Sequence, residues 1–480
     1  MKGIYILIYS FLYLGGIGNA QYTKLLDFSG SNGANPSGDL IYDGIFLYGI
    51  TQNGGTNGVI FKIKPDGSGY SKLFDFDATT IGGAHGSLIS DGTFFYGMTA
   101  QSIFKIKPDG TGYFKLLDFI GANGLDPLGS LISDGTFLYG MTREGGTNIC
   151  DQYGSGCGVI FKIKTDGTGY SKLHDFSLAN GSGPRGALIY EGGFLYGTTW
   201  EGGANCEPHG CGVIFKIKPD GTGYSDLYDF DGTISGAGPV GSLISDGTFL
   251  YGMTMGGGLN GPGTIFKIKP DGTGFSKLLD FSGTANGSHP IGSLIYDGTF
   301  LYGMTREGGT STNCGSGCGV IFKIKPDGTG YSKLLDFTSA NGSDPMGSLI
   351  SDGAFLYGMT RTGGTNNMGV IFSFRAGTTG INETDASASL SMTVYPNPAK
   401  NTITIKFASA DTPKIATLKI NNSLGATVYS EVVKENTNSF TKEINGSTSL
   451  TINVVALPKG VYFVELLQGS NCSVQKFVLQ

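Results

Sequence analysis

The chain has 480 residues, a net charge of −6 and a low content of charged residues, 15%. This length exceeds one ordinary hydrophobic core and predicts a large domain together with a smaller one. No basic cluster of five or more residues occurs, so nucleic acid is not expected as a partner. Glycine is abundant, with 83 residues, but aromatic residues make up 12% of the chain and the sequence repeats. These features favour an ordered fold with glycines at turns.

Residues 1–20 have the pattern of a signal peptide. Lys2 precedes an apolar run from Ile4 to Leu14, and small residues up to Ala20 form a cleavage site. A membrane anchor is the alternative, but the apolar run is too short to span a bilayer. We therefore expect a protein that is exported through the periplasm and is secreted or held at the outer cell surface.

From residue 21 to residue 375 one unit recurs, and its pattern favours four short antiparallel strands. In the copy at 292–337 we predict strand a (GSLI, 292–295), strand b (TFLYGMT, 299–305), strand c (GVIFKIK, 319–325) and strand d (YSKLLDF, 331–337). Asp-Gly pairs between a and b and between c and d indicate hairpin turns. In strand c, apolar residues alternate with Lys323 and Lys325, which predicts one apolar face and one wet face.

The number of copies decides the architecture. The central tyrosine of strand b recurs at steps of 43 to 57 residues, as Tyr48, Tyr96, Tyr139, Tyr196, Tyr251, Tyr302 and Tyr357. Seven four-stranded units of this length predict an all-β fold, a seven-bladed β-propeller over residues 21–375. The first strand d precedes any strand a, and none follows the last strand c. We therefore predict that residues 22–28 pair with residues 370–375 and close the ring.

Antiparallel order divides the loops of this ring between two faces. The a–b and c–d turns form one face, here called the turn face, and they are nearly the same in every blade. The b–c and d–a loops form the other, here called the variable face, where the b–c loop is minimal in blade two and long in blades three, four and six. Variable loops on a rigid scaffold are where binding usually resides.

Six cysteines lie in pairs inside three b–c loops, in a chain with an export signal. We predict three disulfides, which join Cys150 to Cys157, Cys206 to Cys211, and Cys314 to Cys318. Each would stabilise the fold by roughly 2 to 2.5 kcal/mol in the chain-entropy model. Metal binding is the alternative, but each pair lacks further ligands apart from His209. No metal site is expected.

After the repeats the composition changes twice. Residues 376–391 lose the repeat and most apolar residues, which indicates a linker. Residues 392–480 contain short alternating runs such as TITIKF and VYFVELL, which predict a small antiparallel β-sandwich. Cys472 lies in this tail without a partner and is expected to be a buried thiol.

The repeat resembles two known types. The glycine pair after strand b, the VIFKIK strand and the aromatic-led strand d are similar to the kelch propeller repeat, although strand d lacks the kelch tryptophan. They are closer to the Gly-rich GloVer tandem repeats of exported bacterial proteins, and this likeness covers about residues 22–375. The resemblance implies a propeller but names no ligand.

The tail resembles the C-terminal sorting domain of the type IX secretion system of Bacteroidetes. The matching segments are VYPNPAKNTITIKF, NSLGATVYS, LPKGVYFVELL and QKFVLQ. By this resemblance the sorting signal includes Pro396, Asn397, Pro398, Gly460, Tyr462 and Lys476. It implies that the type IX secretion machinery is a partner and that the tail directs secretion and surface attachment.

Catalysis needs residues that depart from the repeat, and few do. The aspartate near the end of strand d recurs in every blade as Asp27, Asp75, Asp118, Asp175, Asp229, Asp280 and Asp336, which predicts a structural hydrogen bond. Carboxylates that break the pattern on the variable face are Asp126, Glu201 and Asp344. We predict no catalytic residue and no cofactor.

Two classes of function follow from this pattern. The first is a non-catalytic, monomeric surface module that binds a glycan or a protein, because aromatic and arginine side chains supply most binding energy. Its predicted contacts are Arg143, Glu144, Tyr153, Arg185, Trp200, Glu201, Arg306, Glu307 and Arg361. Trp200, the only tryptophan, is expected either to stack on a sugar or to pack on its loop. The second class is a secreted lyase, hydrolase or oxidase that acts on carbohydrate.

Overall fold

The structure is a computed structural model. It describes residues 22–77, 83–150, 154–206, 208–375, 392–395, 399–407, 415–422, 427–434, 440–442, 448–455, 457, 460–468 and 471–479. The predicted signal peptide and the predicted linker lie outside the described residues, as does Tyr153.

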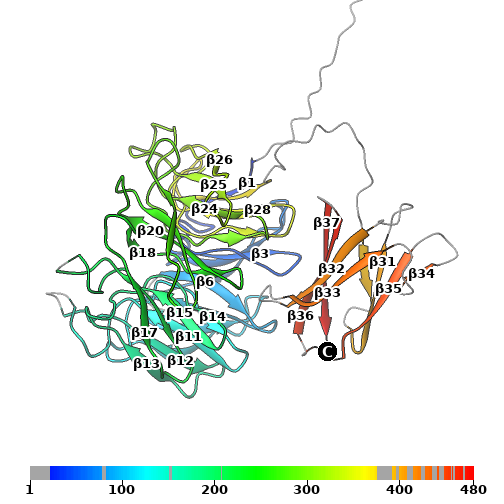
Figure 1. The fold of residues 1–480 in the computed structure, drawn as a ribbon, viewed down its shortest axis with the longest axis horizontal. Coiled ribbons are helices and arrows are strands. Elements are labelled where there is room, and N and C mark those ends of the chain that lie inside the picture. Colours follow the sequence, from blue (N-terminus) through cyan, green and yellow to red (C-terminus); the bar gives the residue numbers. More distant parts are fainter. Residues whose placement is uncertain are drawn as a thin grey trace, which may run out of the picture.

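Between residues 22 and 375 the described residues form seven antiparallel sheets, arranged as the blades of a β-propeller (Figure 1). Blades one to three consist of β2 (Ile41–Tyr42), β3 (Leu47–Thr51), β4 (Val59–Ile63), β5 (Ser71–Asp75); β6 (Ala84–Ser90), β7 (Phe95–Thr99), β8 (Ser102–Ile106), β9 (Phe114–Asp118); and β10 (Ile132–Ser133), β11 (Phe137–Thr142), β12 (Val159–Lys164), β13 (Ser171–Asp175). Blades four and five consist of β14 (Ile189–Glu191), β15 (Phe194–Thr198), β16 (Val213–Ile217), β17 (Ser225–Asp229); and β18 (Ala237–Pro239), β19 (Ile244–Ser245), β20 (Leu250–Gly256), β21 (Thr264–Ile268), β22 (Ser276–Asp280). Blades six and seven consist of β23 (Ile295–Tyr296), β24 (Leu301–Thr305), β25 (Val320–Ile324), β26 (Ser332–Asp336); and β27 (Ile350–Ser351), β28 (Leu356–Thr360), β29 (Val370–Phe374), β1 (Tyr22–Asp27). Strand order therefore follows the chain in each blade except the last.

The ring closes as the sequence predicts. β1 pairs antiparallel with β29, from Tyr22 opposite Phe374 to Asp27 opposite Val370, and completes the seventh blade. A second contact closes the ring at the axis, where Ser348 of blade seven donates its N–H to the carboxylate of Asp39 in blade one. Because both contacts join the first and last copies, the blades form a circle and not an open row.

The hydrophobic core lies between neighbouring blades. Each buried cluster of the ring combines residues from two adjacent sheets; one example packs Phe61 and Leu47 of blade one against Met359 and Ile371 of blade seven. Within each blade the aromatic residues of strands c and d stack, as Phe322 and Tyr331 do at 5.7 Å. A blade therefore buries its apolar side chains only with both neighbours in place, and closure is needed to cover the first and last sheets.

Two local predictions are wrong. Strand a of blade six is Ile295–Tyr296 and not 292–295, because Ser293 donates its N–H to Ser348 of the next blade instead of pairing with strand b. On the predicted wet face of strand c, Lys325 is exposed as expected, but Lys323 is only 4% exposed. Its ammonium lies 4.5 Å from the Phe300 ring. The equivalent lysines of other blades reach backbone carbonyls of a neighbouring blade, as Lys267 reaches Pro326 at 3.0 Å. These contacts replace the water that the alternation predicted.

The structural role predicted for the strand d aspartate is confirmed in five blades. Asp336 Oδ1 accepts the backbone N–H of Thr310 from its own b–c loop at 3.0 Å. The equivalent bonds join Asp27 to Thr365, Asp175 to Thr147, Asp229 to Ala204 and Asp280 to Leu259. The aspartate therefore anchors the loop on the variable face to the sheet that carries it.

The tail forms two four-stranded antiparallel sheets (Figure 1). One has the order β30 (Met392–Tyr395), β31 (Thr402–Phe407), β35 (Thr448–Asn453), β34 (Phe440–Lys442). The other has the order β33 (Thr427–Lys434), β32 (Ile415–Asn422), β36 (Gly460–Gln468), β37 (Asn471–Leu479). Ile405 of the first sheet and Leu418 of the second belong to one buried cluster, as two packed sheets require.

The predicted sorting residues lie in different settings. Tyr462 is 4% exposed in the tail core, and Gly460 pairs with Leu479. Lys476 lies in β37 opposite Phe463, and its side chain is outside the described part. Pro396, Asn397 and Pro398 also lie outside the described residues.

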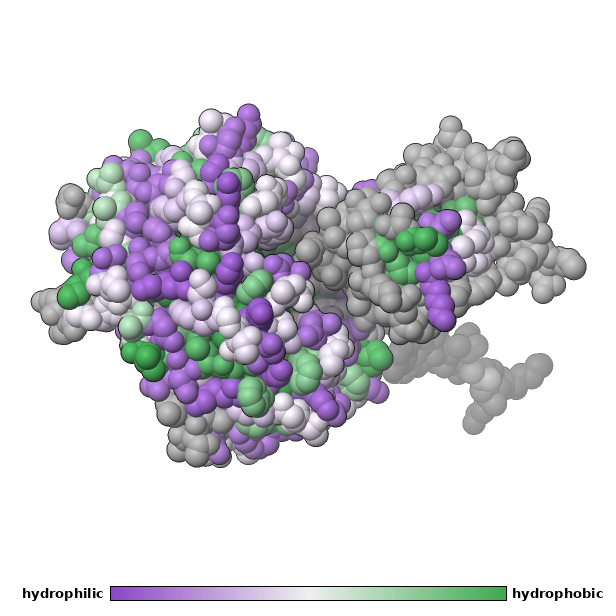
Figure 2. Space-filling view, turned by 90° about the horizontal axis from the view of Figure 1, so that it is seen from below, coloured by the Kyte–Doolittle hydropathy of each residue, from purple (hydrophilic) through white to green (hydrophobic). Residues whose placement is uncertain are grey.

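The surface of the repeat domain is mixed in polarity. Figure 2 shows one face, on which hydrophobic residues lie in small groups between hydrophilic ones. Among the described residues, no helix is long and apolar enough to cross a membrane.

Candidate functional site

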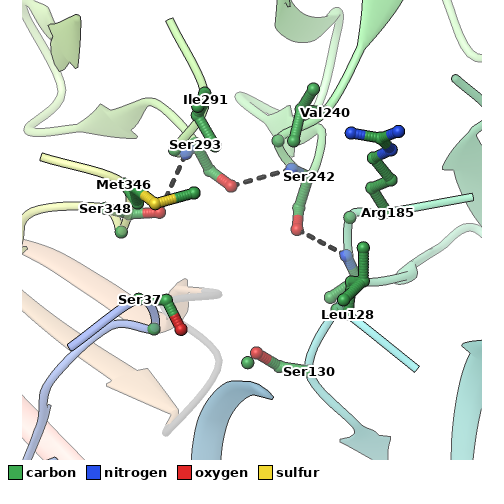
Figure 3. Close-up of a pocket in the computed structure, with 18 of the residues that line it drawn as sticks. Ser37, Leu128, Ser130, Arg185, Val240, Ser242, Ile291, Ser293, Met346 and Ser348 are labelled. Atoms are coloured by element: carbon green, nitrogen blue, oxygen red, sulfur yellow. Dashed lines mark hydrogen bonds between the residues drawn. The ribbon is translucent and has the colours of Figure 1, made fainter. Parts of the chain in front are cut away.

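A cavity of about 370 Å³ lies on the propeller axis and is lined by residues of all seven blades (Figure 3). Its lining residues come from the segments that lead into strand a in every blade and, in blades four to six, from the end of strand b, so it opens on the variable face. A ring of glycines forms its narrow part. A Cβ at Gly292 would lie 2.3 Å from the carbonyl oxygen of Gly347, and one at Gly347 would lie 2.3 Å from that of Gly38. The blades therefore approach each other at the axis more closely than any side chain allows.

A ring of serine hydroxyls follows the glycines. Ser242 donates its N–H to the Oγ of Ser293, and Ser293 donates to Ser348, both at 2.8 Å (Figure 3). In the same way, Asp39 donates its N–H to the Oγ of Ser87, Ser87 donates to Ser130, and Ala187 donates to Ser242. In the described residues the ring is interrupted only between blades three and four, because Ala187 has no hydroxyl to accept the N–H of Ser130. This ring was not predicted from the sequence, although the Gly-Ser pair that precedes strand a in most blades was a signal for it.

Asp39 replaces serine in the first blade and places one carboxylate in the cavity. Its oxygen accepts the N–H of Ser348. Burial raises the pKa of this carboxyl group, and hydrogen bonds from Ser348 and Ser87 oppose the rise. The role of Asp39 was not predicted from the sequence. Its signal was an aspartate at a position where most other blades have serine, the same kind of departure from the repeat that identified Asp126 and Asp344.

The d–a loops present a different side chain from each blade. In blades one, three, six and seven, a non-glycine residue precedes a proline with a positive φ of 53 to 57°; these residues are Asn35, Asp126, His289 and Asp344. Residues with larger side chains rarely adopt this conformation, and it clusters at functional sites. The residue after the proline lines the cavity as Leu128, Val240, Ile291 or Met346, all labelled in Figure 3. In blades three, six and seven the loop therefore presents one polar and one apolar residue at the rim.

Most arginines of the variable face are paired with these carboxylates. Arg143 Nη2 lies 2.8 Å from Asp126 Oδ2, and it also contacts Glu144. Arg306 Nε donates to Asp344 Oδ1 at 2.8 Å, and Arg361 Nη1 lies 3.3 Å from the other oxygen of the same carboxylate. His289 Nδ1 lies 3.3 Å from Glu307 Oε2 on the same face. Asp126 and Asp344 are thereby engaged by guanidinium groups.

Arg185 has a different environment. Its guanidinium carbon lies 3.8 Å from the centroid of the Trp200 ring, and both residues line the cavity. A Cβ at Gly238 would lie 3.2 Å from the same indole, so two neighbours already cover the ring. Burial, followed by the charge of Arg143, lowers the pKa of Arg185, whereas Glu201 and Asp126 oppose this shift. The guanidinium remains a cation at neutral pH. Trp200 therefore packs on Arg185 and holds its guanidinium at the cavity.

The structure gathers part of the predicted contact set at the cavity. Arg185, Trp200 and Arg306 line it directly. Arg143 and Arg361 adjoin it through their aspartates, and Glu144 and Glu307 lie beside these pairs. Glu201 is an electrostatic neighbour of Arg185. His85 also lines the cavity, and burial lowers the pKa of its imidazole, which is neutral at pH 7.

The three predicted disulfides are present, joining Cys150 to Cys157, Cys206 to Cys211 and Cys314 to Cys318. The carbonyl of the second cysteine accepts an N–H from the positive-φ residue of the next blade, as Cys318 does from Asp344 at 3.2 Å. Each disulfide therefore holds the loop that supports the cavity rim. Among the described residues, no three His, Cys, Asp or Glu side chains lie close enough together to hold a metal ion.

Comparison with known proteins identifies both parts of the chain. A family model of the Gloeobacter/Verrucomicrobia repeat matches residues 100–249 and 207–404, which together span more than half of the chain. The chain belongs to this repeat family. A second model, of the secretion system C-terminal sorting domain, matches residues 393–480. The predicted GloVer repeat and sorting domain are thus confirmed, and the sorting domain implies interaction with the type IX secretion machinery and export of this repeat protein.

Several solved structures are similar to this repeat protein at low sequence identity. One is the extracellular domain described as that of a hybrid two component system from B. thetaiotaomicron, with TM-score 0.50 and 13% identity, over 96% of this chain and 59% of that chain. Another is an oligogalacturonate lyase from Vibrio parahaemolyticus, with TM-score 0.47 and 11% identity, over 74% of this chain and 94% of that chain. A third, described as a 6-phosphogluconolactonase from Bacteroides fragilis, has TM-score 0.43 and 16% identity, over 70% and 90% of the two chains. No curated protein matches the sequence.

Proposed function

We propose that this protein is an exported, non-catalytic binding propeller that holds a glycan or protein ligand at the variable face, and that its tail directs type IX secretion and surface attachment. The observation that carries the proposal is the axial cavity, whose rim takes a different side chain from almost every blade. A repeated scaffold that varies at one concave site has the form of a binding site. The domain limits 21–375 and 392–480, the cleaved signal peptide, the monomeric state, the kelch-like relationship and the origin in Bacteroidetes are part of the proposal.

The chemistry of the rim supports binding over catalysis. In general acid–base catalysis an acid donates a proton to the reacting group and a base accepts one, so both side chains must reach that group and be free to do so. Asp126 and Asp344 instead form ion pairs with Arg143, Arg306 and Arg361. Paired guanidinium and carboxylate groups suit recognition of a polar ligand. The protein therefore retains a ligand without turning it over.

The test uses the purified secreted protein in a screen against polysaccharides and surface proteins, with retention and product release measured together. We expect retention without product. Trp200→Ala should weaken retention, whereas Tyr190→Ala, an exposed aromatic of the same blade next to the a–b turn, should leave it unchanged. Product release that is abolished by Asp126→Asn, Glu201→Gln or Asp344→Asn would show a carbohydrate-active enzyme and contradict the proposal.

A further inference from the structure

Arg185 is the cavity arginine that lacks a counter-charge. Arg143, Arg306 and Arg361 each lie within 3.3 Å of a carboxylate oxygen. Among the described residues no carboxylate lies at ion-pair distance from Arg185. Its Nε–H is buried without an acceptor, as are those of Arg143 and Arg361, so the missing ion pair is what distinguishes Arg185. A partly buried donor on a cation is costly to leave unpaired, and a guanidinium is suited to bind a carboxylate through two hydrogen bonds. Trp200 holds this group in place at 3.8 Å.

The serine ring adds hydroxyl donors beside Arg185. The Oγ atoms of Ser130, Ser242 and Ser293 each accept a backbone N–H from a neighbouring blade. Each hydroxyl still has a proton to donate, and within the described chain no acceptor takes it. Asp39 lies three blades from Arg185 around the ring and supplies an acceptor on the far side. The cavity therefore offers a cation at one side, a carboxylate at the other and hydroxyl groups between them.

Part of the remaining lining is apolar. Leu128, Val240, Ile291 and Met346 lie around the cavity (Figure 3), and such side chains pack on C–H groups. A volume of about 370 Å³ holds a small ligand or the end of a longer chain. The occupant that fits this lining carries an anionic group and several hydroxyls, together with C–H surface.

Resting on the proposed binding function, we propose that the axial cavity binds a sugar acid, with the carboxylate of a uronate on the Arg185 guanidinium and its hydroxyls on the serine ring and Asp39. The same chemistry is offered by a free uronic acid and by the uronate at the end of an acidic glycan. The structure assigns the carboxylate to Arg185 because the other arginines of the rim already hold protein carboxylates.

The experiment titrates the full secreted chain with three probes by calorimetry: free glucuronate, a disaccharide that ends in glucuronate, and the methyl ester of that disaccharide. We expect the charged disaccharide to bind at least tenfold more tightly than its ester, because the ester cannot form the hydrogen-bonded ion pair with Arg185. Binding of free glucuronate shows that a single residue suffices, whereas binding only of the disaccharide shows that a chain end is read. Equal affinity for the acid and its ester would overturn the inference.

Variants locate the site and separate the two proposals. Arg185→Gln should weaken uronate binding about ten- to hundredfold, and Arg185→Lys by less because the charge remains. The matched control is Arg375→Gln, since Arg375 follows strand c at its turn-face end and is exposed. If a polysaccharide or protein is retained but uronate is not bound, the sugar-acid inference fails and the binding function stands. If nothing is retained, both fail. The wild-type comparison of acid and ester remains decisive even if Arg185→Gln does not fold.

Discussion

The two faces of the ring are made from the same repeat but tolerate different amounts of change. On the turn face, each c–d hairpin repeats one motif, in which Asp327 Oδ1 accepts the N–H of Thr329 at 2.8 Å and equivalent aspartates do the same. On the variable face, the position after the d–a proline holds Ser37, Leu128, Arg185, Val240, Ile291 or Met346. Hairpin geometry restricts the first face, whereas the second only has to surround a cavity.

The largest expected effect compares glycines at the axis and on the turn face. Gly292→Ala places a Cβ 2.3 Å from the carbonyl of Gly347, where backbone of another blade must move. Gly298→Ala in the a–b turn meets no atom within 4 Å and only adds strain at φ +93°. We expect losses of about 3 kcal/mol or more for the first and about 1 to 2 kcal/mol for the second. Chemical denaturation measures both, and the reverse order would show that the blades are not packed around an axis.

Removing a disulfide should destabilise a loop of the variable face and leave the turn face unchanged in structure. Cys314→Ser with Cys318→Ser should lower the free energy of unfolding by roughly 2 kcal/mol, because the reduced loop gains freedom in the unfolded chain. Thermal unfolding with and without reductant measures the loss of stability. Hydrogen exchange follows the loops one by one, and the loop of blade five, which has no disulfide, is the control because reductant should leave its exchange unchanged. An unchanged midpoint would mean that the disulfide does not brace the rim.

The gap in the serine ring can be closed. Ala187→Ser supplies the missing acceptor for Ser130, so we expect stability to rise by about 0.5 to 1 kcal/mol. Ser293→Ala opens a second gap in the same ring and should lower stability by about 1 kcal/mol. Denaturant midpoints for the two variants should move in opposite directions. A loss for both would show that the ring has no room for a seventh hydroxyl.

Asp39 should make stability depend on pH in the direction opposite to a surface carboxylate. Its folded pKa lies above the unfolded value, so between the two the native state keeps a proton that the unfolded state has released. The free energy of unfolding contributed by this group therefore falls as pH rises through that window. Asp39→Ser, the residue of most other blades, should stabilise the protein more at pH 7 than at pH 3. A gain that is larger at acid pH would contradict the direction of the shift.

Much of this fold could be predicted because one repeat occurs seven times in the sequence. The tyrosine spacing predicted the blade number, and the displaced first strand d predicted that β1 pairs with β29. Contacts between copies could not be seen in one copy. Lys323 was expected to face water, but it lies over Phe300 of its own blade, and Phe300 packs on a buried cluster that blade seven completes. Asp39 and the serine ring were missed for the same reason, since they acquire a role only when seven blades bring them to one axis.

The most direct test of the account is hydrogen exchange on the secreted protein, with and without a ligand that the retention screen identifies. Binding at the variable face should slow exchange in the segments around the cavity, at residues 124–130, 181–187 and 287–293. Exchange in the c–d turns, such as 326–330, should stay unchanged. Protection of the c–d turns with no change at the cavity would contradict the central claim that the variable face carries the function.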